Sequence, residues 1–127
     1  MLDFTGDSGP YLQYTYARLK SILRKAEAKP DATNFSVLDG DYELALARKI
    51  FEFPDVVIKA GELYATSLVA TYLYKLAVAA NKFYETTPIL KDEDAERLRA
   101  RLALVVVAAE TLKSGLGLLG IQTLEKI

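Results

Sequence analysis

Cysteine and histidine are both missing from the 127-residue sequence. Without cysteine, the chain can form no disulfide, no thiolate zinc site and no cysteine nucleophile. Without histidine, it lacks the commonest general base and the commonest transition-metal ligand. It also cannot complete the Glu-x-x-His pairs from which helical bundles build di-metal sites. We therefore expect no catalytic residue and no metal site in this chain.

A strong excess of one charge and a long apolar run are missing too. The 16 basic and 17 acidic side chains give a net charge of -1, whereas domains that coat nucleic acid usually have a pI above about 9. Any RNA binding must therefore be local, through stacking and a few placed charges. The longest apolar run, residues 102–109, is far shorter than the roughly 20 residues of a membrane span. Residues 1–10 do not read as a signal peptide, and we expect a soluble, cytoplasmic protein.

What the sequence does contain is helical periodicity. Apolar residues make up 51% of the chain and recur every three to four positions, with no competing strand pattern. The widest apolar face lies between Tyr64 and Glu85, which predicts a central helix with neighbours on two sides. We predict one all-α domain over residues 1–127, a helical bundle of about five helices. The expected helices cover about residues 10–26, 42–53, 55–62, 64–85 and 92–114, and the glycine-rich residues 115–120 are expected to end the last one.

The first expected helix has two distinct faces. Its core stripe contains Leu12, Tyr16, Leu19, Leu23 and Ala26. Its outward face, an arc of about 60° on the helical wheel, contains Tyr11, Tyr14, Arg18 and Lys25. Half-buried tyrosines and a surface ion pair of Arg18 would explain this face by packing alone. Unpaired RNA bases would explain it equally well, because bases stack on aromatic rings and on arginine.

The loop before this helix, Gly6-Asp7-Ser8-Gly9, presents backbone N–H groups at a helix start. Ser8 is a candidate cap, and Pro10 suits the first turn. No strand precedes the loop and no Lys-Ser/Thr pair follows it, so it is not a phosphate-binding P-loop. By itself the loop indicates only a capped helix start, and its interest comes from the ring-bearing face that follows.

Two arginines four positions apart, Arg97 and Arg101, lie on the last expected helix. We predict that at least one packs its stem into the bundle and pairs its head with a carboxylate, because an unpaired buried charge is very costly. The acidic residues Asp92, Glu93 and Asp94 lie at the expected start of this helix. They are explained by helix capping and solubility, since negative charge is favourable at a helix N-terminus.

Four stretches of the sequence carry a family resemblance. They are GDSGPYLQYTYARLKSILRKA, YLYKLAVAANKFYE, RLRARLALVVVAAETLKSGLGLLGI and QTLEKI. In this order they resemble the C-terminal anticodon-binding domain of arginyl-tRNA synthetase, a class I aminoacyl-tRNA synthetase whose domain is of the all-helical DALR type. The resemblance implies binding to the anticodon loop of arginine tRNA. The matching positions are Gly6, Asp7, Ser8, Gly9, Tyr11, Tyr14, Arg18, Tyr84 and Ile127, and Lys25 adds a charge to the same RNA-binding face.

The same resemblance implies which parts of the enzyme lie elsewhere. The family's catalytic domain has HIGH-like and KMSK-like signatures, and this sequence contains neither. We therefore expect a fragment that is inactive alone and that contacts the catalytic domain of the same synthetase. It should bind no cofactor itself, with ATP and magnesium needed only by the full-length ligase. The alternative is a stand-alone helical protein-interaction module of the same fold, which would bind through an exposed apolar face.

Overall fold

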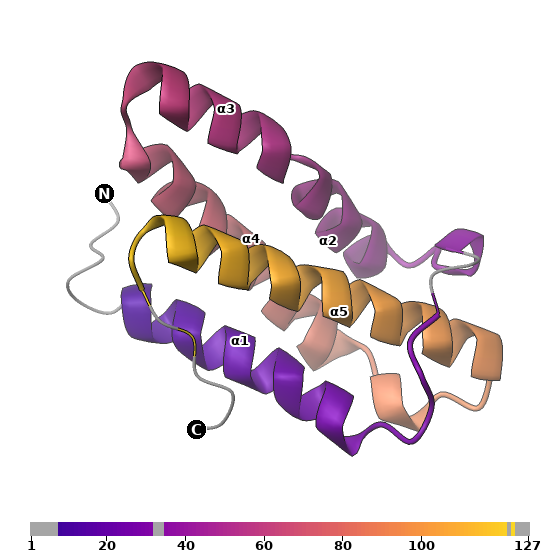
Figure 1. Cartoon of the computed structure of the whole chain (residues 1–127). Coiled ribbons are helices and arrows are strands. Elements are labelled where there is room, and N and C mark those ends of the chain that lie inside the picture. The colour runs from indigo at the N-terminus through magenta and orange to yellow at the C-terminus, as the bar shows by residue number, and fades with distance from the viewer. Residues whose placement is uncertain (1–7, 32–34, 122, 124–127) are drawn as a thin grey trace.

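The chain folds into a bundle of helices. The structure, a computed structural model, describes residues 8–31, 35–121 and 123. These residues contain five α-helices, two short 3₁₀ segments and no strand (Figure 1). In chain order the elements are α1 (Ser8–Lys25), η1 (Phe35–Val37), α2 (Asp41–Phe51), α3 (Phe53–Leu63), α4 (Thr66–Thr86), η2 (Ile89–Lys91) and α5 (Ala95–Leu118). The predicted all-α bundle of about five helices is confirmed.

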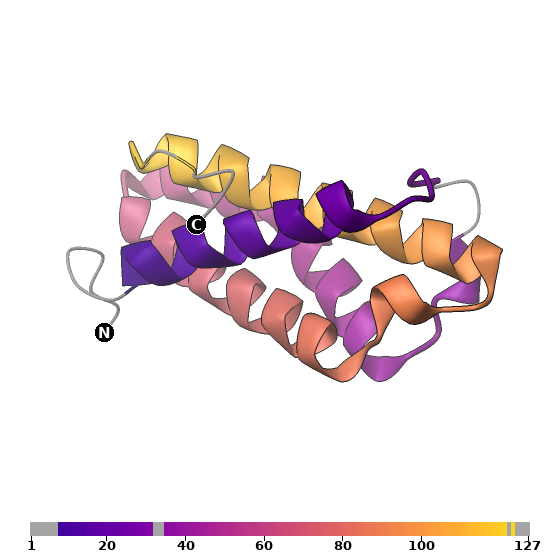
Figure 2. The ribbon, with the colours of Figure 1, turned by 90° about the horizontal axis from the view of Figure 1, so that it is seen from below.

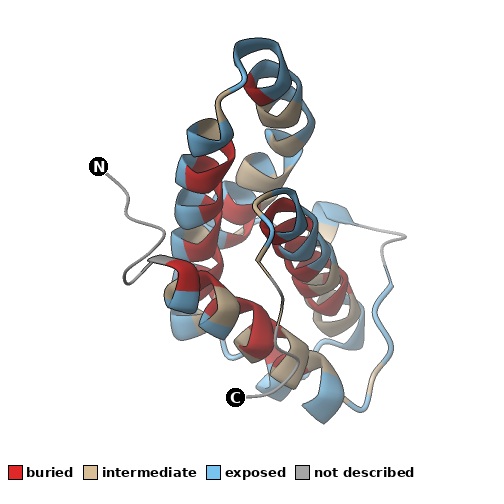
Figure 3. Cartoon of the chain, turned by 60° about the vertical axis from the view of Figure 1, so that its left-hand side comes forward, coloured by how far each residue is buried: buried red, intermediate tan, exposed pale blue. Residues whose placement is uncertain are grey.

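Helices α4 and α5 form the centre of the bundle. Helix α4 contacts all four other α-helices, and α5 also contacts α1 and α2. Figure 2 shows α1 running along both central helices, and Figure 3 shows buried residues turned towards the interior. The core includes Leu12, Tyr16 and Leu19 of the predicted stripe, whereas Leu23 and Ala26 are only partly buried. The two-sided burial predicted for the central helix is therefore observed.

The junction between α3 and α4 lies slightly later than the sequence predicts. Helix α4 begins at Thr66 rather than at Tyr64. Tyr64 takes a left-handed backbone conformation, with φ 52° and ψ 40°, and its N–H donates to the carbonyls of Ala60 and Gly61. Because a left-handed residue ends an α-helix, Tyr64 caps α3 and the chain turns before α4 starts.

The boundary between α2 and α3 is also shifted. Helix α2 ends at Phe51, and α3 begins at Phe53 instead of Asp55. Pro54 lies in the first turn of α3, where a missing N–H costs nothing because that group has no partner within the helix. The proline therefore lies inside the second helix, whereas the expected ranges left it between the two helices.

The end of α5 corrects one expectation. The glycine-rich residues 115–120 do not break the helix at its last predicted residue, since α5 continues to Leu118. Gly115 is buried, and a Cβ atom at this position would lie 2.8 Å from Cδ1 of Leu73 on α4 and closer still to Cδ2. Close packing of the two central helices thus explains this glycine. The helix ends where Gly120 takes a φ of +75°, as in a Schellman motif.

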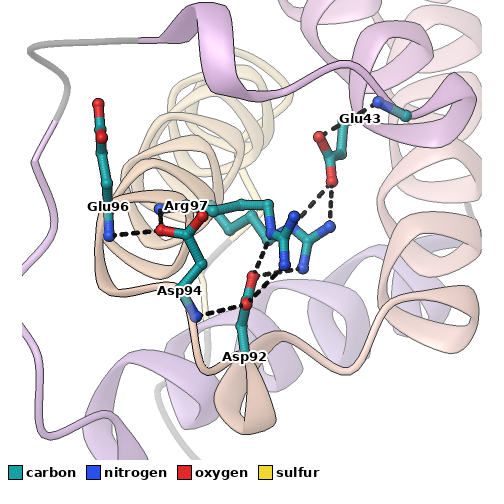
Figure 4. A network of polar contacts seen from close by, with 7 residues as sticks. Glu43, Asp92, Asp94, Glu96 and Arg97 are labelled. Carbon is teal, nitrogen blue, oxygen red and sulfur yellow. Dashed lines mark hydrogen bonds and ion pairs between the residues drawn. The ribbon is translucent and has the colours of Figure 1, made fainter.

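An ion-pair cluster of Glu43, Asp92, Arg97 and Arg101 joins α2 to the start of α5 (Figure 4). Nη2 of Arg101 lies 2.6 Å from Oε1 of Glu43, and Nη1 lies 2.9 Å from Oδ2 of Asp92. Nε of Arg97 lies 2.6 Å from the same Asp92 oxygen. The prediction that an arginine of this helix pairs with a carboxylate is confirmed. The acidic residues at the start of α5 divide between two roles, because Asp94 caps the helix and Asp92 belongs to the cluster.

Candidate nucleic-acid interface

Four of the predicted site residues line one groove. Tyr14, Arg18 and Lys25 of α1 and Tyr84 near the end of α4 border a cavity of about 630 Å³. Residues 87–91, which include η2, form the remaining wall. We refer to this cavity as the α1–α4 groove. The fold thus brings side chains from distant parts of the sequence to one surface.

Arg18 lies beside both aromatic rings of the groove. Its guanidinium carbon is 3.8 Å from the ring centroid of Tyr84 and 5.7 Å from that of Tyr14, within the range of cation–π attraction. Nη1 donates a hydrogen bond to Oδ1 of Asn81 at 2.9 Å and lies 3.9 Å from Oε1 of Glu85. Within the described part of the chain, Nε and Nη2 make no polar contact. No described residue therefore occupies Nε or Nη2 of the guanidinium.

Tyr11 lies outside the groove, although it shares the predicted face with Tyr14. Its ring centroid is 5.6 Å from that of Tyr74, and its hydroxyl accepts a hydrogen bond from Nδ2 of Asn81 at 3.0 Å. Tyr11 is partly buried against the core, whereas Tyr14 is 46% exposed. The predicted face therefore divides: Tyr11 packs between α1 and α4, and Tyr14 faces the groove.

The remaining predicted site residues belong to the two ends of the chain. Ser8 is the first residue of α1, so the helix includes the residue that was expected to cap it. Gly9 is buried in the first turn. Gly6, Asp7 and Ile127 lie outside the described residues.

The contribution of η2 to the groove could not be predicted from the sequence. Lys91 of η2 is exposed and joins Arg18, Arg24 and Lys25, so the described lining contains four cations and no carboxylate. A local concentration of positive charge attracts a polyanion even when the net charge of the protein is near zero. No signal in the sequence around Lys91 points to this role, because it depends on the approach of η2 to α1.

The described residues contain neither a metal-binding cluster nor a membrane-spanning helix. No three His, Cys, Asp or Glu side chains among them lie where they could hold a metal ion. No helix in this part of the chain has both the length and the apolar character needed to cross a bilayer. The buried carboxylates Glu43 and Asp92 are instead partners of arginines.

Comparison with curated proteins identifies similar ligases. The arginine–tRNA ligase of Porphyromonas gingivalis is 42% identical over an alignment of 131 residues, which covers 99% of this chain and 22% of the relative. The arginine–tRNA ligase of Fusobacterium nucleatum is 43% identical over 130 residues, which cover 100% of this chain and 23% of the relative. This chain therefore spans less than a quarter of the length of these relatives.

The fold and a family model agree with this similarity. The solved structure of Thermus thermophilus arginyl-tRNA synthetase matches with a TM-score of 0.83 and 38% identity, over 98% of this chain and 22% of that chain. The model described as DALR anticodon binding domain matches residues 12–127. The matched range includes α4, α5 and nearly all of α1. The chain thus belongs to the DALR anticodon binding domain family.

Proposed function

We propose that this chain is the anticodon-loop recognition module of an arginyl-tRNA synthetase, the enzyme that ligates arginine to its tRNA using ATP. The observation that carries this proposal is the α1–α4 groove, where Tyr14, Arg18 and Tyr84 meet in a member of an anticodon-binding family. Anticodon bases are unpaired in the free loop, and proteins recognise such bases by stacking them on rings and on arginine. The groove offers both kinds of surface.

The groove would make two kinds of contact with an RNA loop. Tyr14 and Tyr84 supply ring faces for stacking, and the open edges of Arg18 supply charged hydrogen-bond donors for a base. Lys25 and Lys91, both exposed at the groove, would hold phosphates, an interaction that salt weakens. The rings and Arg18 would therefore give sequence preference, while the lysines give affinity for any RNA. We propose the terminal residues Gly6, Asp7, Ser8, Gly9 and Ile127 as further contacts.

Aminoacylation would require the rest of the ligase. Two observations support this: the chain spans 22% of a similar ligase, and its sequence has no HIGH-like or KMSK-like signature. In this proposal, residues 1–127 form a single anticodon-binding domain, and ATP and magnesium bind to the catalytic domain. The domain alone would not activate arginine, and it would act in the cytoplasm, where the ligase meets its tRNA.

A second candidate function is protein interaction, favoured by apolar side chains exposed around α3. Phe51 is 81% exposed, Ile58 61%, Leu63 59% and Tyr64 95%. These exposed apolar side chains on and beside α3 form a candidate surface for a protein contact. Within a ligase, we propose that this surface faces the catalytic domain of the same synthetase. In a stand-alone protein of this fold, it would take another partner instead.

Filter binding at two salt concentrations separates the two functions. The chain is titrated into an arginine tRNA and into the same tRNA with a changed anticodon. We expect tighter binding to the unaltered tRNA at both salt concentrations and a general loss of affinity at the higher one. Equal binding of the two tRNAs, or no binding, would reject anticodon recognition and favour the interaction module.

A further inference from the structure

Asn81 is a buried polar residue of α4 that faces α1. It is 7% exposed, and its amide joins three residues of α1. Nδ2 donates to Oγ1 of Thr15 at 2.8 Å and to the hydroxyl of Tyr11 at 3.0 Å. Oδ1 accepts the hydrogen bond from Nη1 of Arg18. Both amide hydrogens and the amide oxygen therefore have partners.

The direction of these hydrogen bonds is dictated by the neighbours of Asn81. Arginine can only donate, so Oδ1 must face Arg18. Thr15 donates its hydroxyl proton to the backbone carbonyl of Tyr11 at 2.9 Å, and its oxygen is thereby left to accept from Asn81. The site thus requires an acceptor on one side and a donor on the other. Asparagine meets both requirements, whereas aspartate has no donor and leucine has neither group.

The amide also fixes one end of the guanidinium without neutralising it. Glu85, the only carboxylate that the described residues place near Arg18, lies 3.9 Å away and its side chain is 59% exposed. The partner at hydrogen-bond distance is the uncharged amide, at 2.9 Å. Nη1 is thereby anchored, the guanidinium carbon is held 3.8 Å from the ring centroid of Tyr84, and Nε and Nη2 point to no other described group.

We propose that Asn81 is a positioning residue for RNA recognition, which holds the Arg18 guanidinium against Tyr84 so that its open edge meets an unpaired base. This inference rests on the proposed function of the groove. Asn81 itself is buried behind Arg18 and touches no ligand. Its effect is to remove rotational freedom from Arg18 before the RNA arrives, which lowers the entropic cost of binding.

Three variants of the 127-residue chain test this role without RNA. Asn81→Ala removes the acceptor, Asn81→Asp keeps an acceptor for Arg18 and loses both donors, and Thr15→Val breaks the network on the side away from Arg18. Nuclear magnetic resonance of the guanidinium N–H groups reports whether rotation of Arg18 is hindered. We expect hindered rotation in the original chain, in Asn81→Asp and in Thr15→Val, and free rotation in Asn81→Ala. Hindered rotation in a folded Asn81→Ala chain would overturn the proposal.

The same variants are then titrated with a synthetic anticodon stem-loop of an arginine tRNA and with a stem-loop whose middle anticodon base is changed. We expect Asn81→Ala to reduce the preference for the unaltered loop about tenfold, the size of one charged hydrogen bond. Asn81→Asp should keep the preference, even though its negative charge weakens binding to both loops. Thr15→Val should lower the melting temperature and keep the preference.

The remaining outcomes count either against the role of Asn81 or against the proposed function of the groove. A preference that survives in Asn81→Ala, with Arg18 freely rotating, overturns the role of Asn81 in recognition. A preference lost equally in Thr15→Val and Asn81→Ala makes the network structural and also overturns it. An original chain without any preference overturns the proposed function of the groove, while the guanidinium signals still report whether Asn81 holds Arg18.

Discussion

Arg101 in the ion-pair cluster and Arg18 in the α1–α4 groove are both held between helices, but their surroundings differ. All three nitrogens of the Arg101 head lie close to carboxylates: Nε and Nη2 to Glu43, and Nη1 to Asp92. Those two carboxylate side chains are 4% and 2% exposed. Arg18 uses one nitrogen, bonded to a neutral amide. Its other neighbours are the rings of Tyr14 and Tyr84 and the exposed carboxylate of Glu85, 3.9 Å away.

This difference separates Arg101, which stabilises the fold, from Arg18, which we propose to bind a ligand. No nitrogen of the Arg101 head is left to donate to a phosphate or a base, so this head serves only the fold. The charge of Arg18 is oriented by an amide and by ring faces and is not matched by a buried carboxylate. In our proposal it acts on an incoming RNA. The two arginines differ both in the number of nitrogens that are bonded and in the charge of the bonded partners.

The largest effect is expected for Arg101→Ala. The variant leaves Glu43 buried without its charged partner, while Asp92 keeps Arg97, and breaking a buried pair costs about 3–5 kcal/mol of unfolding free energy. Urea denaturation followed by circular dichroism measures this loss. RNA affinity per folded molecule should stay the same. A variant that kept its stability but lost RNA preference would reverse the roles that we assign to the two arginines.

A smaller effect, on RNA affinity, is expected for Tyr84→Ala. The substitution removes the ring beside Arg18, and the loss of one stacked base costs about 1–3 kcal/mol of binding free energy. Fluorescence anisotropy of a labelled anticodon stem-loop measures the affinity, and thermal melting gives the stability of the same sample.

Two matched variants control this measurement. Tyr84→Phe keeps the ring and should bind normally, and Tyr42→Ala removes an exposed tyrosine of α2 and should also bind normally. If Tyr84→Ala lowers the melting temperature while affinity per folded molecule stays constant, the ring is a packing residue and the groove assignment is wrong.

Acid should weaken the ion-pair cluster. Hydrogen bonding from Arg97 lowers the pKa of Asp92 from 3.8 to about 2, against the opposing effect of burial. A folded pKa below the unfolded one means that this stabilisation is complete above about pH 4 and is lost as the pH falls towards 2. The urea midpoint of the original chain should therefore fall over this range. Asp92→Asn should start lower at neutral pH and show a flatter dependence, and identical acid profiles would contradict the role of Asp92.

The smallest effect is expected for Lys25→Ala or Lys91→Ala. Each removes one proposed phosphate contact, so affinity should fall alike for all RNAs and the slope of log affinity against log salt should decrease by about one. Lys59→Ala on α3 is the matched control, because this lysine is exposed and does not line the groove. A change of anticodon preference in Lys25→Ala would show that this lysine reads bases.

Local pattern and family resemblance predicted different parts of this molecule. The 3.6-residue period of the first helix was sufficient to place Tyr14 and Arg18 on one outward face, because that relation depends on a single helix. Tyr84 was assigned to the same site only through the resemblance. The wheel could not separate Tyr11 from Tyr14, since the difference comes from the packing of α4 against Tyr11.

Contacts between helices could not be predicted from the sequence. The part that Lys91 plays depends on how η2 folds back against α1, and that of Asn81 on which face of α4 meets α1. The left-handed turn at Tyr64 could not be predicted, because the residue with positive φ is a tyrosine and not a glycine. The continuation of α5 beyond Ser114 follows from tertiary packing, which outweighs the low helix propensity of glycine.

The domain should tolerate substitution of Gly115 poorly, although this residue does not line the α1–α4 groove. Its lack of a side chain lets α5 approach Leu73, which is fully buried in the core. Leu73 belongs to the same continuous helix as Asn81 and Tyr84. A methyl group added at Gly115 would press on Leu73 and thereby on the helix that provides Tyr84 to the groove. The shape of the proposed RNA-binding groove should therefore depend on the spacing of α4 and α5 in the core.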